Sequence, residues 1–230
     1  MDSAIILAGG FGTRLKSVVP DRPKILAEVL GRPFIEYQLE WLMGQGIKKV
    51  TLAVYHMADQ IQEFVDKWSN QKLVIDIIYE DNPLGTGGAV ANVIQKKNIV
   101  GKVLVINGDT LFYFSIKPVL KYMHNKKEPV LLIASKLDNV SRFGTIIVED
   151  GYVKYFQQAT GRCESGIVNV GAYLIDSAIF IENKINPFSL EYNLFPKLAI
   201  NMQLLAYIVK TSEGFFDIGT PSSYKKICKK

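Results

Sequence analysis

Glycines and cations that could bind a polyphosphate gather within the first 24 residues. An apolar run over residues 4–8 is followed within four residues by three glycines, Gly9, Gly10 and Gly12. Glycine lets a backbone approach a ligand closely, and successive N–H groups in such a loop form a concave anion site. Arg14 and Lys24 follow and add donors suited to phosphate oxygens. The pattern predicts polyphosphate binding at the carboxyl end of a first buried strand.

The spacing of this loop excludes two common phosphate-binding motifs. A dinucleotide-binding fingerprint needs a third small residue where Leu15 stands. A Walker loop needs a Lys followed by Ser or Thr, but Arg14 follows the glycines here. An ordinary strand-to-loop turn with two surface cations is the alternative interpretation.

Two aspartates follow predicted strands, and the first of them could hold a metal ion. Asp109 ends the sequence N-G-D after the apolar run 102–107, and Asp217 lies in F-F-D-I-G-T-P. Ligands of open α/β sheets bind at the carboxyl ends of strands, so Asp109 should face the same crevice as the first glycine loop. A carboxylate beside a polyphosphate predicts Mg²⁺. For both residues the alternative is a turn role, and Asp217 could also assist the start of a helix.

A second glycine-rich loop, P-L-G-T-G-G-A over residues 83–89, follows a predicted strand and opens a predicted helix. Glu80 stands five residues before Gly85. A carboxylate only accepts hydrogen bonds, whereas guanine offers two adjacent donors. If this loop binds a nucleobase, as the family resemblance described next implies, Glu80 favours GTP, although Glu80 could instead face solvent or support the loop.

The segment G-G-x-G-T-R-L followed by P-K resembles the signature of the sugar-1-phosphate nucleotidyltransferases. These enzymes join a sugar 1-phosphate to a nucleoside triphosphate and release pyrophosphate. The resemblance runs from residue 4 to residue 224 and implies a GT-A-like fold, Mg²⁺ on Asp109 and Asp217, and catalytic roles for Arg14, Lys24 and Asp109. It implies that nucleotide is bound by Leu7, Ala8, Gly9, Gly10, Gly12, Thr13, Arg14, Glu80, Gly85, Thr86, Gly88 and Gly108.

The sugar side matches the family pattern less closely. R-F-G over 142–144 and N-V-G over 169–171 resemble its sugar-contacting motifs, but F-Q-Q-A over 156–159 stands where the family has Glu-Lys-Pro. Lys154 or Arg162 could replace the missing lysine. The sugar-binding residues that the resemblance implies are Gly144, Lys154, Gln157 and Asn169.

Short family members that act on heptose 1-phosphate resemble this chain most, since they share L-G-T-G-G-A and F-D-I-G-x-P-x-x-Y. The resemblance implies transfer of GMP from GTP to D-glycero-D-manno-heptose 1-phosphate, which supplies an activated sugar for surface polysaccharide. Hexose-1-phosphate uridylyl- or thymidylyltransferase and mannose-1-phosphate guanylyltransferase are alternatives. A non-catalytic, nucleotide-sugar-binding regulatory subunit is an alternative of another class. It is disfavoured because Arg14, Lys24, Asp109 and Asp217 are all present.

The elements that position these residues alternate between strand and helix, which predicts an α/β fold with a Rossmann-like, mixed but mainly parallel sheet flanked by helices. We expect one catalytic domain over residues 1–230. Helices are predicted over 33–45, 58–68, 87–95, 116–125, 189–200 and from 222 to the end. Strands are predicted over 4–8, 50–55, 74–79, 102–107, 130–135, 144–149, 152–157, 167–175, 204–210 and 215–216.

The composition and net charge of the chain limit the classes of partner that it could bind. No apolar run reaches the ~18 residues of a membrane span, and the first residues lack a secretory signal. The net charge of +5 suits small anionic substrates and is too mild to indicate nucleic acid. Two cysteines and two histidines lie without metal-site spacing. We therefore expect a cytoplasmic protein whose partners are a nucleoside triphosphate and a sugar 1-phosphate, with homo-oligomerisation left open.

Overall fold

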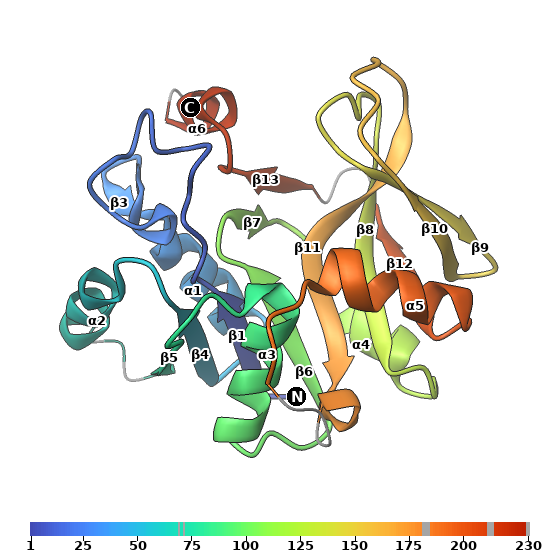
Figure 1. Ribbon diagram of the computed structural model, residues 1–230, viewed down its shortest axis with the longest axis horizontal. Helices are drawn as coiled ribbons and strands as arrows, with labels where there is room; N and C mark the ends of the chain where they lie inside the picture. Colours follow the sequence, from blue (N-terminus) through green and yellow to red (C-terminus); the bar gives the residue numbers. More distant parts are fainter. Residues whose placement is uncertain (69, 71, 181–184, 211–213, 229–230) are drawn as a thin grey trace.

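A nine-stranded mixed sheet forms the centre of the computed structural model, which describes residues 1–68, 70, 72–180, 185–210 and 214–228 (Figure 1). The strand order is β5-β4-β1-β6-β11-β8-β12-β10-β9. These strands are β1 Ser3–Leu7, β4 Lys49–Val54, β5 Val74–Tyr79, β6 Lys102–Asn107, β8 Val130–Leu137, β9 Thr145–Glu149, β10 Tyr152–Gln157, β11 Gly166–Asp176 and β12 Leu204–Val209. The predicted α/β fold with a mixed sheet is thus confirmed.

The first four strands of that order are parallel, and they create the edge on which the site is built. β1 lies between β4 and β6, and Leu7 is in register with Ala53 on one side and Asn107 on the other. β1 and β6 therefore end side by side. The glycine loop after β1 and the N-G-D sequence after β6 leave the sheet at the same edge, as the sequence predicted.

The remaining strands reverse direction. β11 is antiparallel to both β6 and β8, β12 is parallel to β8, and β10 and β9 form an antiparallel hairpin. The turn of this hairpin is Asp150-Gly151, with positive φ at both residues, which is the backbone conformation that a two-residue hairpin turn favours. β9 and β10 stand at the far end of the sheet from β5.

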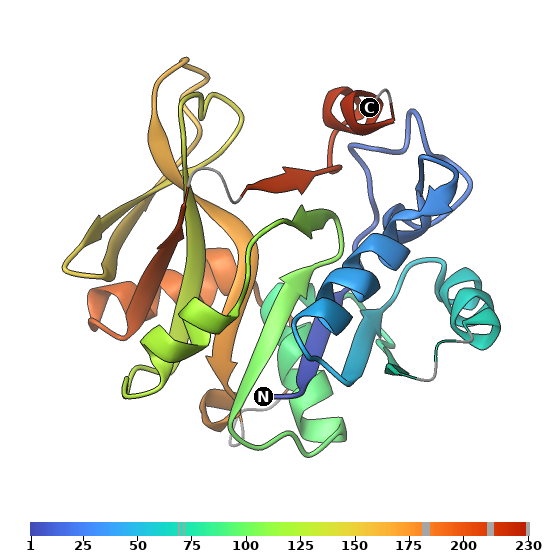
Figure 2. The same ribbon diagram turned by 180° about the vertical axis from the view of Figure 1, so that it is seen from behind.

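Helices cover both faces of the sheet (Figures 1 and 2). Alternate residues of a strand point to opposite faces, so Ile6 and Ile5 enter different core clusters. α1, α2 and α4 pack on the face of Ile6, and α3 and α5 pack on the face of Ile5. The helices are α1 Phe34–Gly44, α2 Ala58–Lys67, α3 Gly85–Lys96, α4 Lys117–Met123, α5 Phe195–Ile200 and α6 Pro221–Ile227. Among the described residues, no helix is long and apolar enough to cross a membrane.

The strand predicted over 215–216 is β13 (Phe215–Asp217), but its partner β7 (Thr110–Phe112) was not predicted. The short pair of β2 (Glu28–Val29) with β3 (Arg32–Pro33) was not predicted either. 3₁₀ turns occupy Lys24–Leu26 and Ser177–Phe180. The single helix predicted over 189–200 is instead a π-helical turn, Leu190–Leu194, followed by α5, because proline favours the first turn of a new helix and Pro196 stands there. The helix predicted from residue 222 ends at Ile227, and residues 229–230 lie outside the described residues.

Candidate active site

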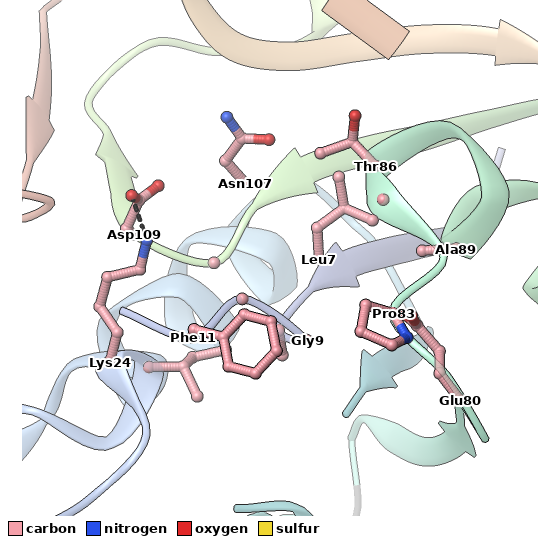
Figure 3. Close-up of a pocket in the computed structure, with 15 residues that line it drawn as sticks. Leu7, Gly9, Phe11, Lys24, Glu80, Pro83, Thr86, Ala89, Asn107 and Asp109 are labelled. Carbon is pink, nitrogen blue, oxygen red and sulfur yellow. Dashed lines mark hydrogen bonds and ion pairs between the residues drawn. The ribbon is translucent and has the colours of Figure 1, made fainter. Parts of the chain in front are cut away.

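A cavity of about 340 Å³ opens where β1 and β6 end (Figure 3). Lys24 and Asp109 line it. So do eight of the residues predicted to bind nucleotide: Leu7, Ala8, Gly9 and Gly10 after β1, Glu80, Gly85 and Thr86 near the start of α3, and Gly108 after β6. The other predicted nucleotide-binding residues, Gly12, Thr13, Arg14 and Gly88, do not line this cavity. The structure thus gathers most of the predicted residues around one space.

The first glycine loop is shaped by its own backbone. The carbonyl oxygen of Gly12 accepts hydrogen bonds from the N–H groups of Leu15 and Lys16, at 2.8 and 3.0 Å. A Cβ on Gly10 would meet no atom within 4 Å, so the loop presents open backbone to the cavity at that point. Arg14 follows in the same loop, and its side chain is exposed.

Close packing explains why two positions of the second glycine loop are glycines. The N–H groups of Gly87 and Gly88 donate to the carbonyl oxygen of Phe188, at 2.9 and 3.3 Å. A Cβ on Gly87 would lie 2.0 Å from the Phe188 ring, and one on Gly88 would lie 2.6 Å from the carbonyl oxygen of Asn186. These two glycines therefore make room for the segment that crosses the start of α3. Gly85 and Thr86 remain at the cavity wall.

The two predicted metal ligands are brought together by the pairing of β7 with β13. Asp217 is in register with Thr110, the residue after Asp109. A Cβ on Gly219 would lie 3.0 Å from Oδ2 of Asp109 and 3.1 Å from Oδ1 of Asp217, so both carboxylates border one small space. Burial and then the negative charge of Asp109 raise the pKa of Asp217, although the Gly219 N–H donates to its Oδ1 at 2.7 Å.

Lys24 supplies the positive charge of this cluster. It begins a 3₁₀ turn after Pro23, and its Nζ lies 2.5 Å from Oδ2 of Asp109. The two side chains keep 23% and 12% of their surface exposed, so the ion pair is partly shielded from water. Figure 3 shows Lys24 reaching across the end of the cavity to Asp109.

The donor chemistry of this cluster fits a divalent cation. Two carboxylates border one space, and burial followed by the negative charge of Asp109 raises the pKa of Asp217. Within the part of the chain that the structure describes, no group of three or more His, Cys, Asp or Glu side chains is placed to hold a metal ion. Phosphate oxygens and water would have to complete the coordination, which is the habit of Mg²⁺.

Gln38 supports the loop that carries Asp109, and the sequence analysis missed it. Its Nε2 donates to the carbonyl oxygens of Asn107 and Thr110, at 2.8 and 2.7 Å. The side chain is fully buried in the apolar stripe of α1. A polar residue inside such a stripe was the available signal, because a buried amide needs hydrogen-bond partners.

The two carboxylate oxygens of Glu80 have different neighbours at the edge of the cavity. Its Oε2 accepts a hydrogen bond from the Leu84 N–H at 2.9 Å, so it supports the second glycine loop. Its Oε1 lies on the side of Gly9, 3.2 Å from the position of a Cβ on that residue. Burial raises the pKa of Glu80, and the bond from Leu84 opposes the shift.

A hydrogen-bonded chain joins the predicted sugar motif to the second glycine loop. Asn169 accepts from the Gly171 N–H at 2.8 Å and donates to the Tyr173 hydroxyl at 2.9 Å. Tyr173 donates to Oε1 of Glu191 at 3.1 Å, and the Thr86 hydroxyl donates to Oε2 of Glu191 at 2.7 Å. Burial and the charge of Glu191 raise the pKa of Tyr173 well above its usual value, so the phenol stays protonated.

The other predicted sugar-binding residues lie on the β9–β10 hairpin. Gly144 packs against the carbonyl of Gln157, and the Gln157 side chain accepts from Thr145 at 2.9 Å. Lys154 donates to Sδ of Met202 at 3.2 Å, beyond the end of α5. Neither Lys154 nor Gln157 lines the cavity, so the structure does not bring either residue to the carboxylates.

Arg142 lies nearer to the carboxylates, although the sequence analysis gave it no role. It lies in the loop between β8 and β9, and its Nη1 donates to Oγ1 of Thr220 at 3.4 Å. Thr220 is the N-cap of α6 and follows Gly219, the residue that borders both carboxylates. Its position in the R-F-G motif could have identified Arg142 as a candidate site residue from the sequence.

The comparisons with known proteins agree with this geometry. The model of the nucleotidyl transferase family matches residues 3–230. D-glycero-alpha-D-manno-heptose 1-phosphate guanylyltransferase of Campylobacter jejuni subsp. jejuni serotype O:2 is 36% identical over 226 residues, which are 96% of each chain. The catalytic subunit beta of mannose-1-phosphate guanylyltransferase of Drosophila pseudoobscura pseudoobscura is 30% identical over 228 residues, 96% of this chain and 60% of that protein.

A solved structure extends the agreement to the fold. HddC from Yersinia pseudotuberculosis, complexed with GMP-PN, superimposes with a TM-score of 0.87 at 34% identity and covers 100% of this chain and 99% of its own. The family model covers residues 3–230, a range that contains both glycine loops and both aspartates. The chain therefore belongs to the nucleotidyl transferase family and is a sugar-1-phosphate nucleotidyltransferase.

Proposed function

We propose that this enzyme transfers GMP from GTP to D-glycero-D-manno-heptose 1-phosphate and releases pyrophosphate. The observation that carries the proposal is that Lys24 and Asp109, with Asp217 beside Asp109, lie at one end of a cavity that Glu80 lines at its other side. The heptose-specific relative matches over 96% of both chains, whereas the mannose-specific relative extends well beyond the match. We further propose that residues 1–230 act as one catalytic domain in the cytoplasm.

GTP would lie along the cavity, with its base beside Glu80. Oε2 of Glu80 is engaged by Leu84, but a carboxylate oxygen accepts more than one hydrogen bond, and Oε1 is turned toward Gly9. The two adjacent donors of guanine match this carboxylate. Thr86 and Gly85 border the same end of the cavity.

The triphosphate would meet the open backbone after β1. The Gly10 to Thr13 backbone and Arg14 are suited to hold the departing pyrophosphate, because several N–H groups and a guanidinium share its charge. Lys24 would leave Asp109 and bind the α-phosphate or the sugar phosphate. Mg²⁺ on Asp109 and Asp217 would supply charge neutralisation at the reacting phosphates when bound.

The reaction would be an in-line displacement. An oxygen of the sugar phosphate forms a bond to the α-phosphorus, and the bond from the α-phosphorus to the pyrophosphate oxygen breaks. No covalent nucleophile of the enzyme is required. Positioning and charge stabilisation by Lys24, Arg14 and the loop backbone would provide the rate enhancement.

The sugar would lie between β11 and the loop that carries the R-F-G motif. Gly144, Lys154, Gln157 and Asn169 keep their proposed sugar-binding roles by resemblance. None of these four residues lines the cavity described above, so the sugar would bind beside it. Asn169 retains one N–H and one lone pair beyond its bonds to Tyr173 and Gly171. Mannose 1-phosphate is the second candidate acceptor, because the similarity to a mannose-1-phosphate guanylyltransferase subunit covers 96% of this chain.

Pyrophosphate release with Mg²⁺ tests the proposal. We would screen GTP, UTP, dTTP, ATP and CTP against heptose, mannose and glucose 1-phosphates. Release with GTP and heptose 1-phosphate is the expected result. Release with UTP or dTTP would overturn the assignment of the base, and a preference for mannose 1-phosphate would overturn that of the sugar. No release with any pair, alongside nucleotide binding, would support a regulatory subunit.

A pair of matched variants controls the screen. Asp109→Asn should reduce turnover by ~10²-fold or more, since a group that stabilises transition-state charge is lost. Asp138→Asn changes an exposed aspartate of the β8–β9 loop outside the cavity and should leave turnover unchanged. Near-normal turnover of Asp109→Asn would refute the metal assignment.

A further inference from the structure

The side chain of Asn107 is an amide without a hydrogen-bond partner in the wall of the cavity. Its Oδ1 is buried and has no partner, and its nitrogen makes no hydrogen bond with any residue that the structure describes. In Figure 3 the amide lies between the side chains of Asp109 and Thr86. Native proteins rarely leave a buried polar group unpaired, and such groups call for an explanation.

The backbone around Asn107 is rigidly held, so the amide does not reach a partner by a shift of the loop. Its carbonyl oxygen accepts from buried Gln38 at 2.8 Å, and its residue is in register with Leu7 of β1. The position at the end of β6 is therefore fixed from two sides.

The neighbouring strand is adapted to the amide. A Cβ on Gly171 of β11 would lie 2.6 Å from Nδ2 of Asn107, and Gly171 has a φ of +78°. The pairing of β11 with β8 is irregular between Asn169 and Tyr173, around this glycine. Glycine is suited to a positive φ and to a close approach, so the strand leaves space for a polar group that nothing in the described chain satisfies.

We propose that Asn107 binds substrate and that its amide hydrogen-bonds a ring hydroxyl, either of the ribose of GTP or of the acceptor sugar. A hydroxyl both donates and accepts, so it can pair with either end of the amide. A phosphate oxygen fits less well, because Asp109 stands two residues away and Lys24 already serves that region. This assignment rests on the proposed function. It adds a hydrogen bond to substrate between the nucleotide side of the cavity and β11, the strand that carries Asn169.

Asn107→Leu tests the assignment, because leucine has a similar shape and no hydrogen-bonding group. Asn125→Leu, at an exposed asparagine after α4, is the matched control. We would measure kcat/KM for GTP and heptose 1-phosphate, then for 2′-deoxy-GTP, 3′-deoxy-GTP and heptose 1-phosphates that lack one hydroxyl. Thermal unfolding without substrate gives a readout independent of activity.

Asn107→Leu is expected to reduce kcat/KM by about 5- to 20-fold, the scale of one hydrogen bond to a neutral group. With the wild-type enzyme, one deoxy substrate should show a kcat/KM that is reduced by the same factor. With Asn107→Leu, that deoxy substrate and the complete substrate should have the same kcat/KM. That substrate identifies the hydroxyl as ribose or acceptor sugar. The unliganded variant should unfold at the same or a higher temperature, since it loses an unpaired buried amide.

A structural role would instead lower the unfolding temperature of Asn107→Leu, and that result would overturn the proposal. Additive losses with every deoxy substrate, or wild-type kinetics of the variant, would also overturn it. If the leucine variant does not fold, Asn107→Ala allows the same comparison. An inactive wild-type enzyme with GTP and heptose 1-phosphate would refute the proposed function, whereas an active wild type with additive losses refutes only the role of Asn107.

Discussion

Replacing Lys24 by methionine should tighten metal binding while it slows the reaction. In the structure the Lys24 ammonium lies 2.5 Å from Oδ2 of Asp109, where a divalent cation would compete for the same oxygen. Methionine keeps much of the length of the side chain and removes the charge. Without nucleotide, the variant therefore leaves Asp109 and Asp217 in contact with no cationic side chain of the described residues, and a metal ion should bind them more tightly.

The size of the effect follows from the separation. Two unit charges 2.5 Å apart interact by about 1.7 kcal/mol even at the dielectric constant of water, ~80. The exposed fractions of 23% and 12% place the pair in a partly dry environment, so this value is a lower bound for the attraction between the charges. An energy of that size corresponds to about a 15-fold gain in metal affinity. Turnover should fall by ~10²-fold or more, because Lys24 no longer stabilises the reacting phosphates.

Mn²⁺ binding followed by electron paramagnetic resonance measures the first effect, and pyrophosphate release measures the second. Lys117→Met on α4 is the control, since Lys117 is exposed and lies outside the cavity. Weaker Mn²⁺ binding by Lys24→Met would refute the view that the lysine and the metal compete for Asp109. Near-normal turnover would refute its contact with the phosphates.

Three further variants test other parts of the site. Glu80→Gln should reduce kcat/KM for GTP by ~10-fold or more and raise that for UTP; unchanged GTP kinetics in the release assay would exclude Glu80 from base recognition. Asp217→Asn should stabilise the metal-free enzyme on the order of 1 kcal/mol near neutral pH. Because burial raises the pKa of Asp217, the gain should shrink as the pH falls and the wild-type carboxyl is protonated; a gain independent of pH in thermal unfolding would contradict this. Gly87→Ala should cost roughly 1–3 kcal/mol in urea unfolding through the clash with Phe188, whereas Gly10→Ala should cost much less; equal losses would disprove the packing explanation.

Local sequence patterns predicted the parallel half of the sheet because its central strands β1 and β6 are apolar runs buried on both faces, whereas β5 at the sheet edge is only partly buried. The end of such a run marks the edge where ligands bind, which is why the glycine loop and Asp109 could be placed together. Asp217 could be added only through the family resemblance. β7, the strand that brings it into position, has three residues and no alternation of its own, so only its pairing with β13 identifies it.

The reasons for the glycines could not be read from the sequence. Gly10 and Gly87 look alike as loop residues, but one faces open space and the other lies under the Phe188 ring. Phe188 is about a hundred positions away along the chain, and no periodic pattern reports a contact of that range. The same holds for Lys154, whose neighbour Met202 is known only from the fold.

The carboxylate of Glu191 joins the second glycine loop to β11, the strand that carries the proposed sugar-binding residue Asn169. It accepts from Thr86 at the cavity wall and from Tyr173, which in turn fixes Asn169. A carboxylate that accepts several hydrogen bonds from half-buried partners holds them in one arrangement, because each lost bond leaves a polar group unpaired. Thr86 therefore cannot shift on nucleotide binding without a change at β11. Since Gly171 of the same strand borders Asn107, the structure predicts that GTP binding prepares the place of the sugar before the sugar arrives.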